Sequence, residues 1–192
     1  MLDPQELPEL PDFASIVHLI AQEGNDLIGC ELGIGLGDSY VTLLNQCRNI
    51  KTLIGIDFWQ PYSDFLLSGD SNNPDYTNTQ EQVEYHERIA RNRVESSGES
   101  HRAEIRKIDS NDAVHDYENE TFDFILVDTY MTKEQAMNDL ISWYPKLKKN
   151  GLFCGHDYHT QTIQEVVHEF RFQNNIDSPM STFDRTFVWR KQ

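Results

Sequence analysis

Carboxylates and one histidine follow the short apolar segments of this chain, where proteins built of parallel strands often carry their chemistry. The residues are Glu31, Asp57, Asp109, Asp128, His156 and Asp157. Carboxylate oxygens can bind divalent cations, and an imidazole can move a proton near neutral pH. If these segments form one parallel sheet, their carboxyl ends meet at the same edge, where ligands bind. The sequence therefore predicts an acidic ligand site at that edge.

A glycine-rich loop, ELGIGLGD, runs from Glu31 to Asp38 after the first apolar segment. Its glycines, Gly33, Gly35 and Gly37, have the spacing G-x-G-x-G, whereas a dinucleotide-binding loop has G-x-G-x-x-G and seats a diphosphate on the following helix. The carboxylates of Glu31 and Asp38 would repel a diphosphate. A ligand with adenosine, an ammonium and a sulfonium but no phosphate suits the loop better, and S-adenosylmethionine is such a ligand. The alternative is a tight turn that binds nothing.

The second apolar segment ends at Asp57, 20 residues after Gly37. This is close to the spacing at which an acidic side chain accepts hydrogen bonds from both ribose hydroxyls, although an aspartate can also simply cap a turn. Residues 58–80 are rich in turn-forming residues and in aromatic side chains that we expect to be exposed, including Phe58 and Trp59. Loops of this length in compact domains are usually functional or disordered, and we expect a loop or lid whose aromatic residues either clamp a ligand or pack the loop.

Strand-like and helix-like segments alternate along the chain. The spacing of apolar residues predicts helices over 13–22, 39–46, 80–96, 133–149 and about 163–170, and strands over 26–32, 52–57, 103–108, 122–127, 151–158 and 181–190. This alternation favours an α/β fold, a doubly wound Rossmann-like mixed sheet of about seven strands, mostly parallel with an antiparallel strand near the C-terminus. We expect residues 1–192 to form a single domain.

The chain contains 32 acidic and 16 basic residues, which gives a net charge of −16. Nucleic acids and anionic membranes are bound through Lys and Arg, so this balance argues against both partners and favours a small-molecule acceptor. No run of about 18 apolar residues is present, and the acidic start of the sequence is unlike a secretory signal. We therefore expect a cytoplasmic protein that is a monomer or a homodimer.

About residues 27–158, from ELGIGLG to GHDY, resemble a class I S-adenosylmethionine-dependent methyltransferase. The loop is combined with IGID, with IDSND and with FDFILVDTYMTKEQAMNDLISWYPKLKKNGLFCGHDY, a segment similar to the macrocin-type and sugar O-methyltransferases and, more distantly, to catechol O-methyltransferase. The resemblance implies methyl transfer to an oxygen of a small molecule, such as a sugar or polyhydroxylated compound. The implied cofactor residues are Glu31, Gly33, Gly35, Gly37 and Asp128 at the methionine side, Asp57 at the ribose, Phe58 or Trp59 near the adenine, and Asp109 with Ser110 at the adenine edge.

The same resemblance implies that Asp128 and Asp157 bind a divalent metal such as magnesium, which would hold two neighbouring hydroxyls and lower the pKa of the attacking one. This chain departs from the group at His156, where relatives have a second acid, and an imidazole suits softer metals better. It departs again at residues 129–131, where the group commonly has a His or Asp as general base and this chain has Thr-Tyr-Met. The expected catalytic residues are Asp128, His156 and Asp157. His156 is either the base or a structural residue, and both acids have alternative roles as helix caps or cofactor contacts without a metal.

Two other functions remain open from the sequence. The first is a nicotinamide-dependent oxidoreductase on a Rossmann sheet, which the loop spacing and Asp38 disfavour. The second is a non-catalytic module that binds the cofactor or a partner protein, which the missing base at residues 129–131 favours. Loss of turnover without loss of folding on substitution of Asp128 or Asp157 would distinguish an enzyme from such a module.

Overall fold

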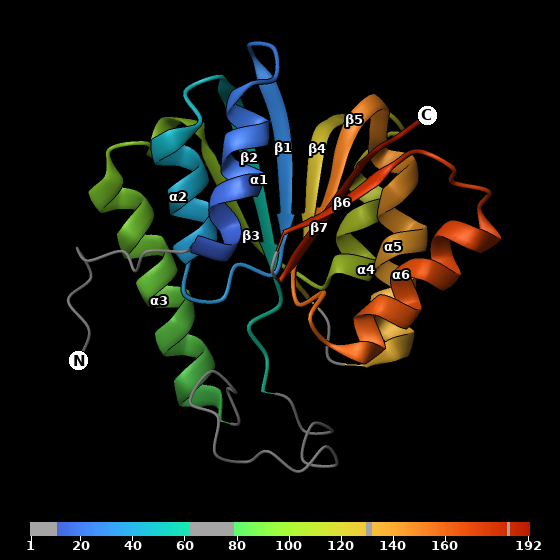
Figure 1. Cartoon of the computed structure of the whole chain (residues 1–192). Coiled ribbons are helices and arrows are strands. Elements are labelled where there is room, and N and C mark those ends of the chain that lie inside the picture. The colour runs from blue at the N-terminus through green and yellow to red at the C-terminus, as the bar shows by residue number, and fades with distance from the viewer. Residues whose placement is uncertain (1–10, 62–78, 130–131, 184) are drawn as a thin grey trace.

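The computed structural model describes residues 11–61, 79–129, 132–183 and 185–192, and in these ranges strands and helices alternate along the chain (Figure 1). The strands are β1 (Leu27–Leu32), β2 (Ile50–Asp57), β3 (Ala103–Lys107), β4 (Phe122–Val127), β5 (Leu147–Gly155), β6 (Met180–Phe183) and β7 (Thr186–Arg190). The helices are α1 (Pro11–Ala21), α2 (Asp38–Gln46), α3 (Gln80–Ser97), α4 (Ser110–Ala113), α5 (Lys133–Trp143) and α6 (Gln161–Gln173). The loop or lid expected over 58–80 falls largely on residues 62–78, which lie outside the described residues.

The strands form one sheet in the order β3-β2-β1-β4-β5-β7-β6. β1 pairs in parallel with both β2 and β4, and parallel pairing continues to β3 on one side and to β5 on the other. β7 runs antiparallel to its neighbours β5 and β6. The predicted Rossmann-like mixed sheet, mostly parallel with an antiparallel strand near the C-terminus, is therefore confirmed. Strand order reverses between β1 and β4, and open α/β sheets bind ligands beyond the carboxyl ends of the strands at such a point.

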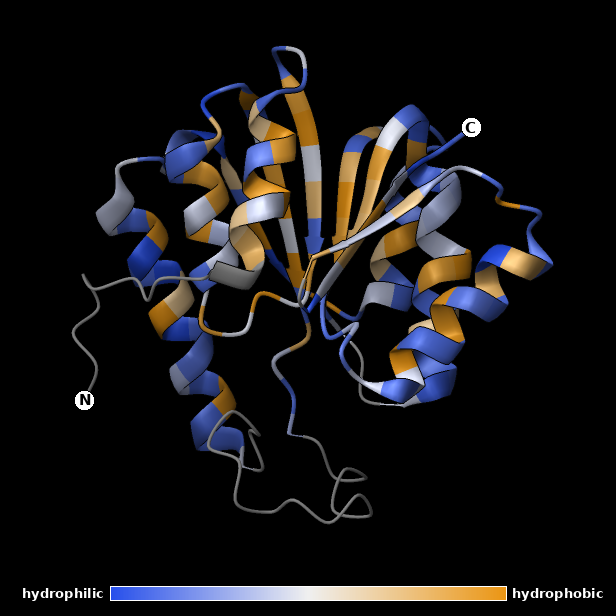
Figure 2. Cartoon of the chain, in the orientation of Figure 1, coloured by the Kyte–Doolittle hydropathy of each residue, from blue (hydrophilic) through white to orange (hydrophobic). Residues whose placement is uncertain are grey.

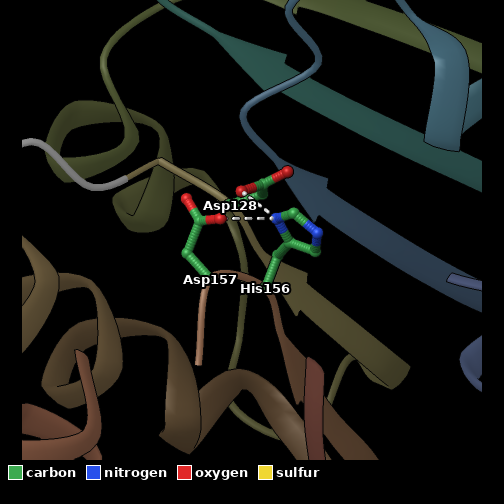
Figure 3. A group of neighbouring side chains, drawn as sticks. All are labelled: Asp128, His156 and Asp157. Carbon is green, nitrogen blue, oxygen red and sulfur yellow. Dashed lines mark ion pairs between the residues drawn. The ribbon is translucent and has the colours of Figure 1, made fainter. Parts of the chain in front are cut away.

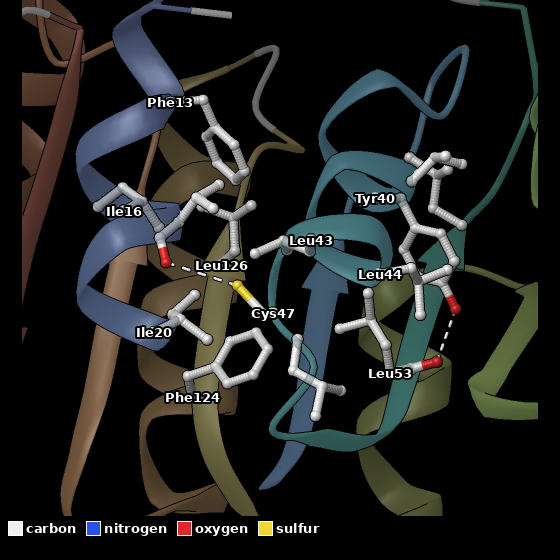
Figure 4. Packing of buried hydrophobic residues seen from close by; sticks show 14 of the residues in the cluster. Phe13, Ile16, Ile20, Tyr40, Leu43, Leu44, Cys47, Leu53, Phe124 and Leu126 are labelled. Atoms are coloured by element: carbon white, nitrogen blue, oxygen red, sulfur yellow. Dashed lines mark hydrogen bonds between the residues drawn. The ribbon is translucent and has the colours of Figure 1, made fainter. Parts of the chain in front are cut away.

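Strand side chains alternate between two apolar clusters, one on each face of the sheet. On β4, Phe124 and Leu126 belong to the cluster that α1, α2 and α3 cover, whereas Ile125 and Val127 belong to the cluster that α5 and α6 cover. Figure 4 shows the first cluster, in which side chains of α1 and α2 pack against β2 and β4. Figure 2 shows the apolar sheet between helices whose outer faces are hydrophilic. Burial on both faces explains why these strands are continuous apolar runs in the sequence.

Threonine caps start the helices that follow the site loops. Thr132 accepts the N–H of Gln135 at the start of α5, and Thr160 accepts the N–H of Ile163 at the start of α6. Such caps satisfy N–H groups that have no partner inside the helix. The caps therefore fix where the connections after β4 and β5 turn back toward the sheet.

The predicted helix over 133–149 is wrong beyond Trp143, where α5 ends. Pro145 lacks the N–H that an α-helix needs, so the chain passes through a short 3-10 turn and enters β5. On β5, the amino group of Lys148 lies 2.9 Å from Oδ1 of Asp123. This cation therefore joins two strands instead of ending a helix.

The single strand predicted over 181–190 is two strands. β6 and β7 form an antiparallel pair in which Phe183 lies opposite Thr186. Among the described residues, no helix combines the length and the apolar character that crossing a membrane requires.

Candidate functional site

The glycine-rich loop and the end of β4 lie against each other where strand order reverses. Gly33 donates its N–H to the carbonyl of Ile56, and Asp128 donates its N–H to the carbonyl of Leu32, both at 2.8 Å. A Cβ atom on Gly33, whose φ is +83°, would lie 2.1 Å from the carbonyl oxygen of Asp128. Because only glycine permits this approach, the structure brings the predicted cofactor loop next to the predicted metal ligand.

Asp57, at the end of β2, braces the glycine-rich loop. Its Oδ2 accepts the N–H groups of Ile34 and Gly35, both at 2.8 Å, and its Oδ1 accepts the N–H of Trp59 at 2.8 Å. Burial raises the pKa of Asp57, and these three hydrogen bonds act in the opposite direction. The carboxylate predicted to bind a ribose is thus engaged by the backbone around it, with one further acceptor direction left on Oδ1.

Trp59 packs against the same loop. It is 3% exposed, and its Nε1 donates to the carbonyl oxygen of Gly35 at 3.1 Å. The guanidinium carbon of Arg91 lies 5.9 Å from the centre of its ring. The expectation that Trp59 is exposed is therefore wrong, because its ring fills the space between the loop and α3. Phe58, in contrast, is 48% exposed and remains open to a ligand.

Glu31, the last residue but one of β1, is fully buried with one oxygen unsatisfied. The hydroxyl of Ser39 donates to Oε1, and among the described residues Oε2 has no hydrogen-bond partner. Burial raises the pKa of Glu31 well above its ordinary value, and the charges of Asp128 and Asp57 raise it further. A buried, half-satisfied carboxylate beside a glycine loop is suited to receive a cationic group of a ligand.

Asp38, at the start of α2, is paired with a cation. Its Oδ1 lies 2.7 Å from Nη1 of Arg93, which also donates to the carbonyl oxygen of Leu36 at 2.8 Å. Arg93 is 4% exposed, so this ion pair is largely removed from water. The guanidinium of Arg93 therefore offsets the charge of Asp38, which weakens the repulsion of a diphosphate that the sequence predicted from this carboxylate.

Asp128, His156 and Asp157 form a group where β4 and β5 end (Figure 3). The imidazole Nδ1 lies 3.5 Å from Oδ1 of Asp128 and 3.2 Å from Oδ1 of Asp157. One candidate ligand atom from each residue lies within 4.8 Å of the other two, and all three side chains are partly buried. Asp157 has a left-handed φ of 51°, a conformation that aspartate tolerates better than most residues. The three residues predicted to be catalytic are thus brought together.

The charges within this group favour a protonated imidazole. Burial disfavours the charged ring of His156, but hydrogen bonds and charges from Asp128 and Asp157 outweigh burial and raise its pKa to about 10. Burial raises the pKa of Asp128, and the contact with His156 opposes that shift. At neutral pH the imidazole of His156 is therefore protonated, and it lies between the side chains of Asp128 and Asp157.

Asp109 and Ser110, predicted at the adenine edge, follow β3. Asp109 caps the short helix α4 by accepting the N–H of Asn111 at 2.8 Å. Ser110 is 6% exposed, and its hydroxyl donates to Oδ1 of Asp139 at 2.6 Å. The Ser110 hydroxyl therefore points into the protein, and Asp109 is the more accessible of the two.

Sequence reasoning missed Asp139 and Arg93, two buried charged residues next to the site. Asp139 is fully buried on α5, between the buried Ala136 and Trp143. A carboxylate placed on the apolar face of a helix was a signal that could have identified it. Arg93 is buried on α3 beside Ala90 and Val94, but its partner Asp38 lies in another element, so the sequence did not identify the pair.

A sequence family described as a methyltransferase domain matches residues 30–158. This span contains the glycine-rich loop and every residue of the Asp128 group. No curated protein matches the chain.

Several solved structures share the fold. The O-methyltransferase NovP is 16% identical with a TM-score of 0.66, covering 92% of this chain and 79% of that one. A protein from Corynebacterium glutamicum is 14% identical with a TM-score of 0.66, covering 96% and 83%. The precorrin 8w decarboxylase of Methanobacterium thermoautotrophicum is 11% identical with a TM-score of 0.66, covering 100% and 96%. At such low identity these likenesses show the fold alone.

Proposed function

The chain belongs to the methyltransferase-domain family, and from this premise we propose that it transfers the methyl group of S-adenosylmethionine to an oxygen atom of a small molecule. The acceptor we favour is a sugar or another polyhydroxylated compound with neighbouring hydroxyl groups. The observation that carries the proposal is the Asp128, His156 and Asp157 group beside the glycine-rich loop. The family membership also removes the main support for a nicotinamide-dependent oxidoreductase.

The residues around the glycine-rich loop fit S-adenosylmethionine. The unsatisfied Oε2 of the buried Glu31 suits an ammonium group, and a Cβ placed on Gly35 would meet no described atom within 4 Å. Phe58 offers an exposed aromatic face for the adenine ring. We assign Glu31 and the loop glycines to the methionine side of the cofactor, Asp57 to the ribose side, and Asp109 to the adenine side.

When bound, the cofactor supplies an electrophilic methyl group on a sulfonium. In-line displacement at this methyl group depends mainly on the alignment of nucleophile, carbon and sulfur, so the protein contributes positioning. In this assignment Asp57 and Trp59 fix the loop from one side, and Asp128 fixes it from the other. A small number of groups that handle protons is consistent with this chemistry.

The Asp128 group fits a divalent cation by the chemistry of its donors. Two carboxylates and one imidazole converge within 4.8 Å, and this mixed set favours Mn²⁺ or another transition metal over Mg²⁺. A cation held there would supply a Lewis acid that lowers the pKa of an acceptor hydroxyl. His156 must lose its proton before its Nδ1 can bind a metal, since the raised pKa keeps the ring protonated at neutral pH.

Without a metal, His156 would not serve as a general base at neutral pH, because a protonated ring cannot accept a second proton at Nδ1. It would instead donate hydrogen bonds to Asp128 and Asp157 and hold them in place. If the site held a cation, Asp128, His156 and Asp157 would be its ligands, and the cation would lower the pKa of an acceptor hydroxyl, whose proton would pass to solvent water.

The net charge of −16 supports a small acceptor over a nucleic acid. The test is transfer of a labelled methyl group from S-adenosylmethionine to panels of catechols, sugars, RNA and protein. We expect transfer to a small vicinal diol, strengthened by Mn²⁺. Transfer to RNA alone would contradict the proposal.

Metal binding is tested by calorimetric titration with Mn²⁺ and Mg²⁺ at several pH values. We expect Mn²⁺ to bind more tightly than Mg²⁺, more tightly at higher pH and with release of a proton. Asp157→Asn should abolish the binding. The control is Asp123→Asn. This substitution removes a carboxylate that is paired with Lys148 near the start of β4, at the opposite end of that strand from Asp128. Equal Mn²⁺ binding by Asp157→Asn and the wild type would contradict the assignment.

A further inference from the structure

Asp139 is a buried carboxylate that the proposed function leaves without a role. It lies on α5 with 0% exposure, and its two oxygens accept from two hydroxyls. Ser110 donates to Oδ1 at 2.6 Å, and Thr129 donates to Oδ2. Within the described ranges Asp139 forms no ion pair, although burial raises its pKa. A buried carboxylate without a cation is costly, so its presence calls for a reason.

The two hydroxyls belong to loops that the sheet does not hold together. Ser110 begins α4 after β3, and Thr129 follows Asp128 at the end of β4. In the strand order, β2 and β1 lie between β3 and β4. Backbone pairing therefore fixes the separation of these two loops only through two intervening strands. Asp139 joins them directly, from the helix that packs beneath both.

A second contact from the same helix strengthens this connection. Trp143 donates from Nε1 to the carbonyl oxygen of Ser110 at 3.2 Å. One turn of α5 therefore holds both the side chain and the backbone of Ser110. The neighbours of the two bridged residues are Asp109, which the proposed function places at the adenine side of the cofactor, and Asp128, which the family resemblance places at the methionine side.

We propose that Asp139 is a positioning residue for cofactor binding, which sets the separation between the loop after β3 and the loop after β4. The inference rests on the proposed function, because it takes the cofactor to lie across these two loops. Asp139 itself does not touch the ligand. Its loss should lower cofactor affinity by letting the two loops separate, even where the protein stays folded.

Asp123 provides a control near the start of β4, at the end of the sheet opposite the Asp128 group. Its Oδ2 accepts the N–H of Ile28 at 2.8 Å, and both of its oxygens lie 2.9 Å from the amino group of Lys148. It therefore also joins separate strands through one carboxylate. If Asp139 contributed to stability alone, Asp139→Ala and Asp123→Ala would lower the affinity for S-adenosylhomocysteine to the same extent.

The experiment is calorimetric titration of the full chain with S-adenosylhomocysteine, together with thermal unfolding of each variant. We expect Asp139→Ala to weaken binding at least tenfold, and Asp123→Ala to weaken it less than twofold at a comparable loss of thermal stability. Asp139→Asn should recover most of the affinity, because the Ser110 and Thr129 hydroxyls can each donate to or accept from an amide. Thr129→Val, which removes a single bond, should weaken binding severalfold and serves as the test if Asp139→Ala does not fold.

Binding by Asp139→Ala, or by Thr129→Val if the alanine variant does not fold, within twofold of the wild type would overturn the positioning role and leave the proposed function intact. Failure of the wild type to bind S-adenosylhomocysteine would overturn both. An equal loss of affinity in Asp139→Ala and Asp123→Ala would assign the effect to stability and also reject the positioning role.

Discussion

The ends of the sheet at which the parallel strands begin and finish are here called its amino edge and its carboxyl edge. At the amino edge, acidic side chains are paired with cations. Asp123 contacts Lys148 at 2.9 Å, and Glu99 contacts Arg102 at 2.8 Å. At the carboxyl edge, the buried Glu31 has a serine hydroxyl as its hydrogen-bond partner and one free oxygen among the described residues. The same residue types therefore occur in two different electrostatic settings.

The pKa shifts follow the same division. The hydrogen bonds from Arg102 and Arg48 lower the pKa of Glu99, whereas burial raises the pKa of Glu31, Asp57 and Asp128. The cations beside Glu99 stabilise its charged form, whereas the buried Glu31 has no cation beside it among the described residues, a cost that a cationic ligand would relieve. We therefore expect the ion pairs at the amino edge to contribute to folding and Glu31 to contribute to ligand binding.

The sharpest test of this contrast is Glu31→Gln. Removing the charge leaves the shape and the Ser39 hydrogen bond, but an ammonium group would lose its buried counter-ion, which typically costs about 3 kcal/mol or roughly a hundredfold in Kd. We expect this loss in calorimetric titration with S-adenosylhomocysteine, with no fall in melting temperature. An unchanged Kd would remove Glu31 from the binding site.

The converse substitution is Asp123→Asn at the amino edge. It weakens a salt bridge and a hydrogen bond to a backbone N–H, so we expect a loss of about 1–2 kcal/mol in the free energy of unfolding. Urea denaturation measures this loss, and affinity for S-adenosylhomocysteine should stay within twofold. A large loss of affinity would break the division between the two edges.

A smaller effect is expected for Trp59→Phe. The ring is kept, but the hydrogen bond to the carbonyl of Gly35 is lost, which should cost about 1 kcal/mol and weaken cofactor binding severalfold. Tyr40→Phe is the control, because it removes a hydroxyl that donates to the carbonyl of Leu53 at 2.6 Å and accepts the N–H of Glu104 at 3.1 Å. The control should lose at least as much stability as Trp59→Phe and no affinity. Equal affinities for the two variants would show that Trp59 does not hold the loop.

The smallest expected effect concerns how the free energy of unfolding depends on pH, which should differ in direction between Asp139 and Glu99. The pKa of Asp139 is raised, so its contribution to stability is largest below the ordinary aspartate value and decreases as pH rises through the raised pKa. The pKa of Glu99 is lowered, so its contribution is present above the ordinary glutamate value and is lost as pH falls. Unfolding free energies of Asp139→Asn and Glu99→Gln, each compared with wild type from pH 3 to 7, should show opposite slopes. Slopes of the same sign would contradict the contrast.

The sequence predicted the sheet and the acidic strand ends well, because continuous apolar runs and glycine spacing are local signals. It could not predict the partners of those acids. Arg93 pairs with Asp38 on another helix, and Asp139 accepts from Ser110, which lies 29 positions earlier in the chain. Such contacts depend on which helix covers which loop. Trp59 was misjudged for the same reason, since its burial depends on the packing of α3 against the loop.

The position of β1 between β2 and β4 has a consequence for synthesis of the chain. β1 gains β2 soon after it is made, but its contact with β4 joins Ile28 to Asp123, 95 residues later. At translation rates of about 5–20 residues per second, one edge of β1 stays without its partner for roughly 5–20 s. An unpaired edge can pair with another chain, so the nascent protein is exposed to aggregation during this interval. The strand order thus leaves β1 without one of its neighbours until β4 has emerged from the ribosome.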